Sequence, residues 1–222
     1  MVKASERPLG HRLTVNWNER VSISTPMHKY GGIPSTGVDL PLCSGCGDHL
    51  HLLLQVDLSD SQLGYLNLAP LAYLFILTCL NCASYEKPMY YRIGARGNEI
   101  TILQEKAGVC VREYPDPLDE YPISLRLLRD NEYPLTEENC LHLLEMEGKH
   151  QLGGMPIWVQ REERIPCIVC KRGMEYVAMV DSELYIGKDG FREKGHMFGD
   201  EGILYTFVCR KCGVFANRAQ GV

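Results

Sequence analysis

The sequence predicts a mainly β protein of the α+β class, made of two pseudo-symmetric β-rich modules from an internal duplication, with a helix in the connection between them. Three observations carry this prediction. Eight of the ten cysteines form four Cys-x-x-Cys pairs, apolar segments of strand length precede the second pair of each set, and the same motifs recur in the same order in both halves. Each module is therefore expected to carry a four-cysteine zinc knob.

The cysteine pairs form two sets. Two thiolates three residues apart can hold one ion from a tight turn, and two such turns complete a tetrahedral zinc site. The predicted ligands are Cys43, Cys46, Cys79 and Cys82 in one half and Cys167, Cys170, Cys209 and Cys212 in the other. In a reducing compartment such thiols favour metal binding, with disulfides, redox thiols or another metal as the alternatives. We expect two structural zinc ions, and the spacing leaves open whether the pairs share an ion within or between the halves.

The two halves also repeat other motifs. A Gly-Gly-x-Pro sequence precedes the first cysteine pair of each set, at 31–34 and again at 153–156. In both halves 11 positions separate the second cysteine of that pair from an aspartate, Asp57 or Asp181, at the end of an apolar run. The step to the next pair is 33 positions in one half and 39 in the other. The same order with a variable loop indicates a duplicated module.

The expected organisation has four parts: an N-terminal strand region (1–29), a first zinc-ribbon-like repeat unit (30–83), a connection (84–149) and a second repeat unit (150–222). Alternating apolar residues predict a strand over Arg12–Ile23. Almost continuous apolar runs predict strands buried on both faces over Leu50–Leu58 and Leu71–Thr78. These two strands would bring the cysteine pairs of the first unit together.

The connection is the least patterned region. Short strands are expected at Tyr90–Arg92 and Glu99–Leu103, and the four prolines within 114–134 predict an irregular segment. Thr136 is a good N-cap, acidic residues follow it, and Gly148 is a helix stop, so a helix is predicted over 136–147.

Composition narrows the class of protein. The 222 residues are 45% hydrophobic and 23% charged, which is typical of a soluble globular protein. The net charge of −5 makes nucleic acid an unlikely main ligand. The longest apolar stretch, 71–80, is half of the roughly 20 residues that a membrane span needs, and the N-terminus lacks the apolar core of a signal peptide. We therefore expect a cytoplasmic protein with no membrane contact, in which Cys110 and Cys140 are buried thiols.

Catalytic signatures are not found in the sequence. The half-signature Pro166-Cys167-x-x-Cys170 occurs in zinc deaminases, but no His-x-Glu or Cys-x-Glu accompanies it. Phosphate-binding loops, the nucleophile elbow and the His-Glu-x-x-His helix are also missing. Two complete four-cysteine sets would leave no open metal position. A non-enzymatic protein is expected, with an enzyme of unrecognised type as the alternative.

The second half resembles the bacterial YwqG-like family. The similarity rests on the segment 150–160, on Cys167-x-x-Cys170, on 179–181 and on 198–207. The first half, from Gly31-Gly32 to Cys79, is similar in pattern to the eukaryotic programmed-cell-death-protein-two family. The resemblance implies a β-rich fold of duplicated units. For the bacterial branch it implies an immunity protein from a polymorphic toxin locus, and for the eukaryotic branch an escort of ribosomal proteins.

These features predict a zinc-stabilised protein-binding protein, with an immunity protein that neutralises a cognate toxin as the favoured class. The alternatives are a chaperone for a basic, ribosomal-type protein and an RNA-binding zinc module. Partner contacts are expected on the loops 187–202 and 116–133, because charged surface loops suit recognition. The candidate contact residues are Asp189, Arg192, Glu193, Asp200 and Glu201.

Overall fold

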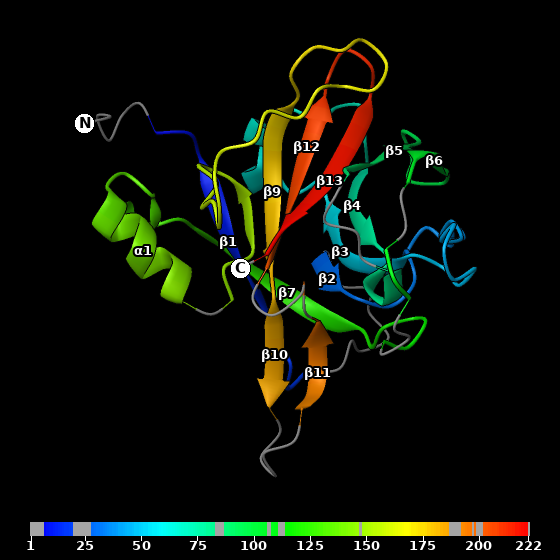
Figure 1. The fold of residues 1–222 in the computed structure, drawn as a ribbon, viewed down its shortest axis with the longest axis horizontal. Coiled ribbons are helices and arrows are strands. Elements are labelled where there is room, and N and C mark those ends of the chain that lie inside the picture. The colour runs from blue at the N-terminus through cyan, green and yellow to red at the C-terminus, as the bar shows by residue number, and fades with distance from the viewer. Residues whose placement is uncertain are drawn as a thin grey trace.

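The computed structural model describes residues 7–19, 28–82, 87–105, 108–110, 114–146, 148–186, 192–196, 198 and 202–221. It is mainly β, with one curled sheet of 11 strands in the order β4-β3-β2-β7-β1-β8-β9-β12-β13-β5-β6 and a separate hairpin, β10-β11. All pairings of neighbouring strands are antiparallel. Figure 1 shows β9, β12 and β13 at the centre, with β3 to β6 on one side and helix α1 on the other.

The strands are β1 (Gly10–Val15), β2 (His28–Tyr30), β3 (His51–Asp57), β4 (Tyr73–Thr78), β5 (Met89–Ile93), β6 (Ile100–Gln104), β7 (Tyr121–Leu127), β8 (Gln151–Gly153), β9 (Glu175–Asp181), β10 (Glu183–Ile186), β11 (Arg192–His196), β12 (Ile203–Cys209) and β13 (Val214–Gln220). The helices are α1 (Glu137–Glu145) and the short 3₁₀ segments η2 (Ser61–Leu66), η3 (Leu80–Cys82) and η4 (Asp130–Glu132). Strands β3 and β4 confirm the two buried strands predicted around the first cysteine set.

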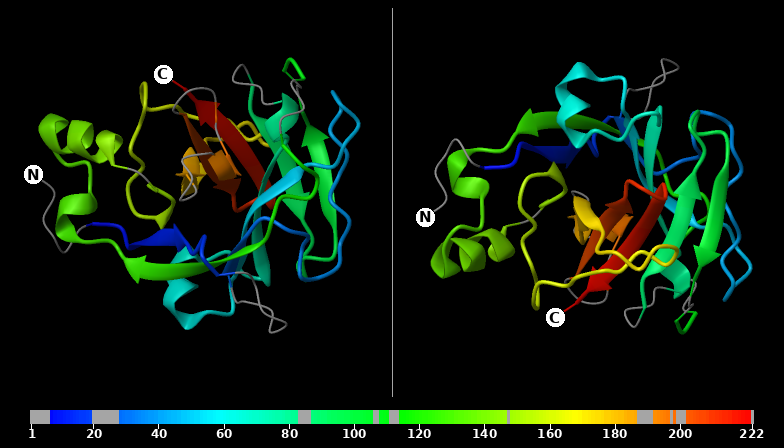
Figure 2. Two further views of the ribbon diagram at one scale, coloured as in Figure 1. Left: turned by 90° about the horizontal axis from the view of Figure 1, so that it is seen from below. Right: turned by 90° about the horizontal axis from the view of Figure 1, so that it is seen from above.

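The sheet curls until strand β4 comes against β5 and β13, as the two views of Figure 2 show. Side chains close the remaining gap. The Tyr91 hydroxyl of β5 donates to the Phe75 carbonyl of β4 at 2.8 Å, and the Asn217 amide of β13 donates to the Leu77 carbonyl at 2.6 Å. These bonds satisfy the outward-facing carbonyls of an edge strand, which would otherwise be unpaired.

Two apolar clusters lie on the two faces of the curled sheet. The larger cluster combines residues of both halves, including Leu54 and Phe75 from the first and Val180 and Phe215 from the second. The smaller cluster packs Leu143 of α1 and Ile157 against the outer side chains of β9, β12 and β13, such as Tyr205. Both cysteine sets are therefore attached to apolar packing, the first set to the larger cluster and the second set to the smaller one.

Strand β7 corrects the prediction of an irregular segment over 114–134. It lies in the middle of the sheet, pairing with β1 along Ile123–Leu127 and with β2 at Tyr121 and Pro122. Pro122 has no amide hydrogen, which is tolerated here because it sits where β7 changes from one partner strand to the other. Its carbonyl still accepts from the Asn16 amide at 2.9 Å.

Helix α1 lies in the segment for which the sequence predicts a helix. The Thr136 side chain accepts from the Asn139 amide at 3.1 Å, and Glu137 and Glu138 occupy the first turn. Strand β1 ends at Val15 and a turn follows, so the strand predicted over Arg12–Ile23 is too long; residues 20–23 of that range lie outside the described part of the chain. In the described part of the chain, no helix has the length and apolar character that crossing a membrane requires.

Candidate metal centres

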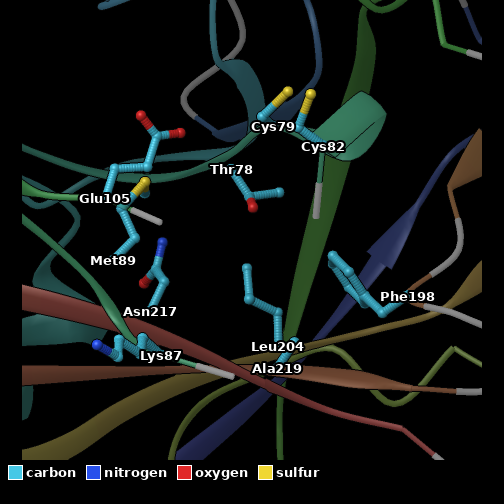
Figure 3. Close-up of a pocket in the computed structure, with 10 residues that line it drawn as sticks. All are labelled: Thr78, Cys79, Cys82, Lys87, Met89, Glu105, Phe198, Leu204, Asn217 and Ala219. Atoms are coloured by element: carbon cyan, nitrogen blue, oxygen red, sulfur yellow. The ribbon is translucent and has the colours of Figure 1, made fainter. Parts of the chain in front are cut away.

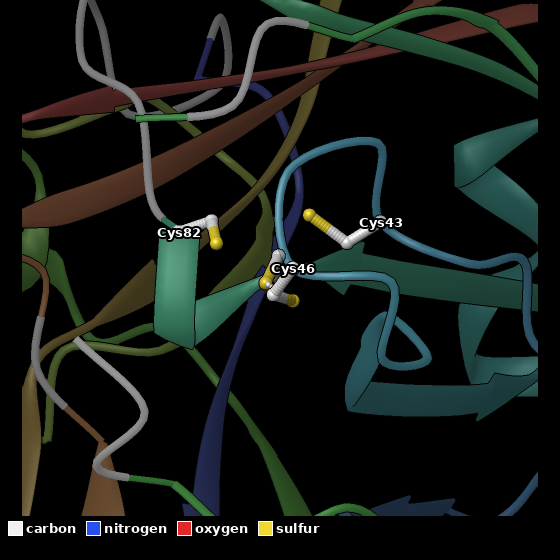
Figure 4. Close-up of side chains that lie close together, drawn as sticks. Cys43, Cys46 and Cys82 are labelled. Atoms are coloured by element: carbon white, nitrogen blue, oxygen red, sulfur yellow. Dashed lines mark hydrogen bonds between the residues drawn. The ribbon is translucent and has the colours of Figure 1, made fainter. Parts of the chain in front are cut away.

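The first four-cysteine group joins a loop to the end of a strand. Cys43 and Cys46 come from the loop before β3. Cys79 directly follows β4, and Cys82 ends the 3₁₀ turn η3 that comes after it. The four sulfur atoms lie within 4.8 Å of one another, and the sulfurs of Cys46 and Cys79 are 3.7 Å apart. Figure 4 shows Cys43, Cys46 and Cys82 directed toward a common centre. The set can hold a metal ion.

The second group has the same construction. Cys167 and Cys170 form the turn before β9, Cys209 ends β12, and Cys212 lies in the turn to β13. Its sulfurs also lie within 4.8 Å of one another, with 3.6 Å between Cys170 and Cys209. All eight predicted ligands are thus brought together within their own half, and all are free thiols with no disulfide among them.

Matching hydrogen bonds shape the two cysteine turns. The Cys43 amide donates to the Asp48 carbonyl and the Cys167 amide to the Arg172 carbonyl, both at 2.8 Å. The chain reverses through a left-handed residue in each turn, Gly47 with φ 80° and Lys171 with φ 61°. Such a turn aims both cysteine side chains to one side, which is the geometry that a shared ion needs.

The local environments shift the thiol pKa values in opposite directions. Burial raises the pKa values of Cys43, Cys79 and Cys82. The backbone amide of Arg172 lowers the pKa of Cys170 to about 6. The burial of Cys79 and Cys82 favours neutral thiols, which a bound cation would convert to thiolates. The first group also contains Cys46, whose pKa is lowered, although burial opposes this, by a hydrogen bond from the Asp48 amide, and burial raises the pKa values of Cys209 and Cys212 in the second group. Each group therefore combines thiols with raised pKa values and one thiol with a lowered pKa.

The second centre is linked to the first half through Arg210, which lies between its third and fourth cysteines. The guanidinium donates to the Leu66 carbonyl at 2.8 Å, also to the Asn67 carbonyl, and to Glu175 at 2.8 Å. This basic side chain therefore joins the two halves.

A buried histidine stands beside the terminal aspartate of each apolar run. The Asp57 amide donates to His28 Nδ1 at 3.2 Å, and the Asp181 amide donates to His150 Nδ1 at 3.0 Å. The other ring nitrogen pairs with a carboxylate in both cases: Asp60 at 3.1 Å from His28, and Glu183 against His150. The comparison of the halves above finds the two aspartates and overlooks the histidines, although the sequence carries a signal for them: His28 and His150 each stand three positions before the repeated Gly-Gly-x-Pro motif.

Cys110 corrects the prediction of two buried thiols. It is exposed, and its segment lies beside Cys82, a member of the first group, because the Gly108 amide donates to the Cys82 carbonyl at 2.8 Å. Cys140 is partly buried on α1 and packs against the smaller apolar cluster. The sequence spacing gives no signal for the contact between Gly108 and Cys82, because it depends on the fold of the intervening chain.

A small cleft opens beside the first group (Figure 3). Polar and apolar groups share its lining, which includes Met89, Phe198 and Leu204 together with Thr78 and Asn217. Lys87 and Glu105 are the charged side chains among its lining residues. Asn217 is already bonded to Thr206 at 2.9 Å and to the Leu77 carbonyl, so its polar groups serve the fold.

The predicted partner-binding residues fall mostly outside the described part of the chain. Asp189, Asp200 and Glu201 lie outside the described residues, and Arg192 and Glu193 are described only as backbone of β11. Of the second predicted contact loop, 116–133, residues 121–127 are strand β7 instead.

In comparisons with known proteins, no family model, no curated protein and no solved structure matches the chain.

Proposed function

We propose that the two four-cysteine groups hold structural zinc ions. The observation that carries this is the sulfur spacing. A tetrahedral ion with Zn–S bonds of about 2.3 Å requires sulfurs about 3.8 Å apart, and the two spacings are 3.7 and 3.6 Å. Four sulfurs fill the coordination sphere of such an ion, so each zinc would stabilise the fold and leave no position for a substrate.

The halves are also proposed to derive from one duplicated unit. Support comes from the matched cysteine turns, from the paired histidine–aspartate contacts and from the strand order. Reading inward from β4, the order β4-β3-β2-β7 corresponds to β12-β9-β8-β1 on the other side. The Gly-Gly pairs correspond too, because Gly31 and Gly153 both have a left-handed φ, of 68° and 61°.

We propose that the protein binds another protein and, by the resemblance to the YwqG-like family, that it is an immunity protein for a cognate toxin. The surface favoured for binding, termed the first-knob surface, comprises Leu42, Val109, Glu105 and Asp116. Leu42 and Val109 are large apolar side chains that are 60% and 86% exposed; Leu42 precedes Cys43, and Val109 follows Gly108, which bonds the Cys82 carbonyl. Asp116 bonds the His49 ring at 3.0 Å and Glu105 accepts from the Ser44 amide at 2.9 Å.

This surface suits a basic partner. Apolar anchors surrounded by acidic groups combine a desolvated contact with electrostatic steering toward positive charge. The net charge of −5 acts in the same direction. A nuclease or nucleotide-modifying toxin is a basic protein of this kind. A ribosomal-type protein shares that charge, so the chaperone function is the alternative outcome of the same test. The engagement of Arg210 with Glu175 weakens the case for RNA.

The test captures tagged protein from its native host at low and high salt and identifies what is retained by mass spectrometry. The wild type is compared with a double variant, Leu42→Asp with Val109→Asp, and with a control, Leu141→Asp. Leu141 is 59% exposed on α1, on the opposite side of the molecule from β3 and β4 (Figure 1). We expect one basic protein, encoded beside this chain and toxic when expressed alone, to be retained by the wild type and by the control but lost from the double variant.

Other outcomes contradict parts of the proposal. Retention of a ribosomal protein would replace immunity by the chaperone function, and salt-released RNA would support the RNA-binding alternative. Equal retention by the double variant would remove the first-knob surface from the interface. For the metal, Cys43→Ser and Cys167→Ser should each lower bound zinc from two ions per chain to one and lower the melting temperature. Unchanged zinc content would contradict the zinc assignment.

A further inference from the structure

The two cysteine turns match in backbone conformation and differ in charge. In each turn the amide of the first cysteine donates to the carbonyl of the residue five positions further on, which is Asp48 in the first turn and Arg172 in the second. The residue before it has a left-handed φ in both turns. The turn 43–49 contains an acid and no lysine or arginine, whereas the turn 167–173 contains two adjacent cations and no acid. Equivalent places on the two knobs therefore carry opposite charge.

The second knob presents an exposed basic surface with an apolar residue in it. This second-knob surface comprises Val169, Lys171, Arg172 and Lys211, all of them exposed. They lie together because the two turns that carry them share one four-cysteine group, whose sulfurs lie within 4.8 Å of one another. Val169 is 53% exposed, comparable to Leu42 on the first knob.

The cations of the second-knob surface are not compensated within the chain. Glu175, an exposed carboxylate close to them in sequence, is already paired with Arg210 at 2.8 Å. The Lys171 ammonium bonds a backbone carbonyl at 2.9 Å, which leaves its charge without a counterion. Among the residues that the structure describes, no salt bridge involves Lys171, Arg172 or Lys211. Their charge is available to another molecule.

Compensation of thiolate charge does not explain this difference between the knobs. Both groups consist of four cysteines, so cations that served only to offset thiolates would be expected in both turns. The first knob instead places Asp48 beside Glu105 and Asp116 of the first-knob surface, which bond the amides of Ser44 and His49. The opposite signs therefore indicate recognition of oppositely charged surfaces.

We propose that the first-knob surface of one copy binds the second-knob surface of another copy, so that the chains associate head to tail. Both surfaces combine exposed apolar side chains with charge, and their opposite signs favour this pairing over contact between like knobs. In Figure 1 the end of β12, which carries the second knob, is at the top, whereas β3 and β4, which carry the first, lie lower on the right. Each associated pair therefore keeps one free knob of each kind, and the assembly can grow beyond a dimer.

This inference goes beyond the proposed function, because the purified protein alone is sufficient to test it. A basic partner and a second copy would compete for the first-knob surface, so partner binding should reduce association between copies. Retention of a basic partner by a chain that does not self-associate would overturn this inference and leave the proposed function in place.

The experiment measures the molar mass of the intact chain by analytical ultracentrifugation over a range of protein concentrations. In about 0.1 M salt the mass should rise with concentration above that of one chain and continue past that of a dimer. In about 1 M salt, where the Debye length falls from about 10 Å to about 3 Å, the association should be lost. A mass that stays at one chain in low salt, or association that persists in high salt, would overturn the inference.

Two charge-neutralised variants identify the surfaces. Glu105→Gln with Asp116→Asn removes acidic charge and keeps acceptors for the amides that these side chains bond. Lys171→Gln with Lys211→Gln removes charge from the second knob. Each variant should remain a single chain on its own, with metal content unchanged. When mixed, they should form a one-to-one dimer that does not grow, because the mixture retains one intact surface of each kind.

The control is Glu137→Gln with Glu138→Gln, which removes two charges at exposed positions of α1 and should associate as the wild type does. A mixture of the two knob variants that stays at the mass of one chain would overturn the head-to-tail arrangement. So would either knob variant that associates alone as strongly as the wild type.

Discussion

The Nδ1 atom of His150 accepts a hydrogen bond of 3.0 Å from the backbone amide of Asp181. The ring is fully buried, and its Nε2 atom pairs with Glu183. Because Nδ1 is an acceptor here, the ring hydrogen must sit on Nε2, where the carboxylate accepts it. Trp17 also donates to Glu183, at 2.8 Å. The histidine therefore joins β8, β9 and β10 and the turn after β1.

Replacing this histidine should be costly. His150→Ala would leave the buried amide of Asp181 without an acceptor and open a cavity, which we expect to destabilise the fold by about 2–4 kcal/mol. The measurement is chemical denaturation with zinc content checked in parallel. His142→Ala is the control, because His142 is exposed on α1 and should change stability by less than about 0.5 kcal/mol. Equal effects of the two substitutions would mean that the Asp181 contact contributes little.

The Gly-Gly pairs are required by space as well as by backbone conformation. A Cβ on Gly31 would lie 2.0 Å from the Asp119 carbonyl oxygen, and one on Gly153 would lie 2.5 Å from the Tyr65 ring. Gly31→Ala and Gly153→Ala should each destabilise the protein by more than about 2 kcal/mol, through left-handed strain and overpacking together. Gly37→Ala is the control for strain alone, because Gly37 has φ 71° but open space around it. If all three variants melted alike, crowding would not be the reason for these glycines.

The sequence predicts the metal centres better than the sheet that supports them. Cysteine spacing is a local signal, and it identifies all eight grouped thiols. Strands β3 and β4 are also predictable, since continuous apolar runs such as Leu74–Leu77 carry their own signal. Strand β7 is missed because Pro122 contradicts its strand character locally, and the supporting partners are distant in sequence. The contact between the Gly108 amide and the Cys82 carbonyl is likewise not predictable from the sequence, because it depends on tertiary structure.

Glu132 should make stability depend on pH in the acid range. It is buried between Arg12 at 3.1 Å and Arg126, and although burial alone would raise its pKa, these partners lower it to about 2. A carboxylate with a depressed folded pKa stabilises the fold above its unfolded pKa, and this contribution fades as the pH falls through that value toward 2. The difference between 4.5 and about 2 corresponds to about 3 kcal/mol at neutral pH.

The test for this carboxylate is Glu132→Gln. It should lose about 3 kcal/mol at pH 7 and show a shallower loss of stability between pH 5 and 4 than the wild type. Glu162→Gln, at an exposed position, should leave both quantities unchanged. A variant with the wild-type slope would show that Glu132 is not the titrating group.

His196 should dominate at milder acidity. Its ring is fully buried and stacks on Tyr30 with 5.5 Å between the ring centroids. Its Nδ1 atom and the Tyr30 hydroxyl share a hydrogen bond of 3.1 Å. Burial, together with the neighbouring His150, lowers its pKa from 6.5 to about 3. The folded protein thus holds this ring neutral while the unfolded chain protonates it, so stability is complete above pH 6.5 and declines as the pH falls from there toward 3. The expected slope approaches about 1.4 kcal/mol per pH unit between pH 6 and 5.

The test is His196→Phe, which removes the titrating group and keeps an aromatic ring against Tyr30. The stability of this variant should change less with pH across this range. The exposed control His142→Ala should keep the wild-type slope. A His196→Phe variant that loses stability as steeply as the wild type between pH 6 and 5, with unchanged metal content, would show that acid sensitivity arises elsewhere.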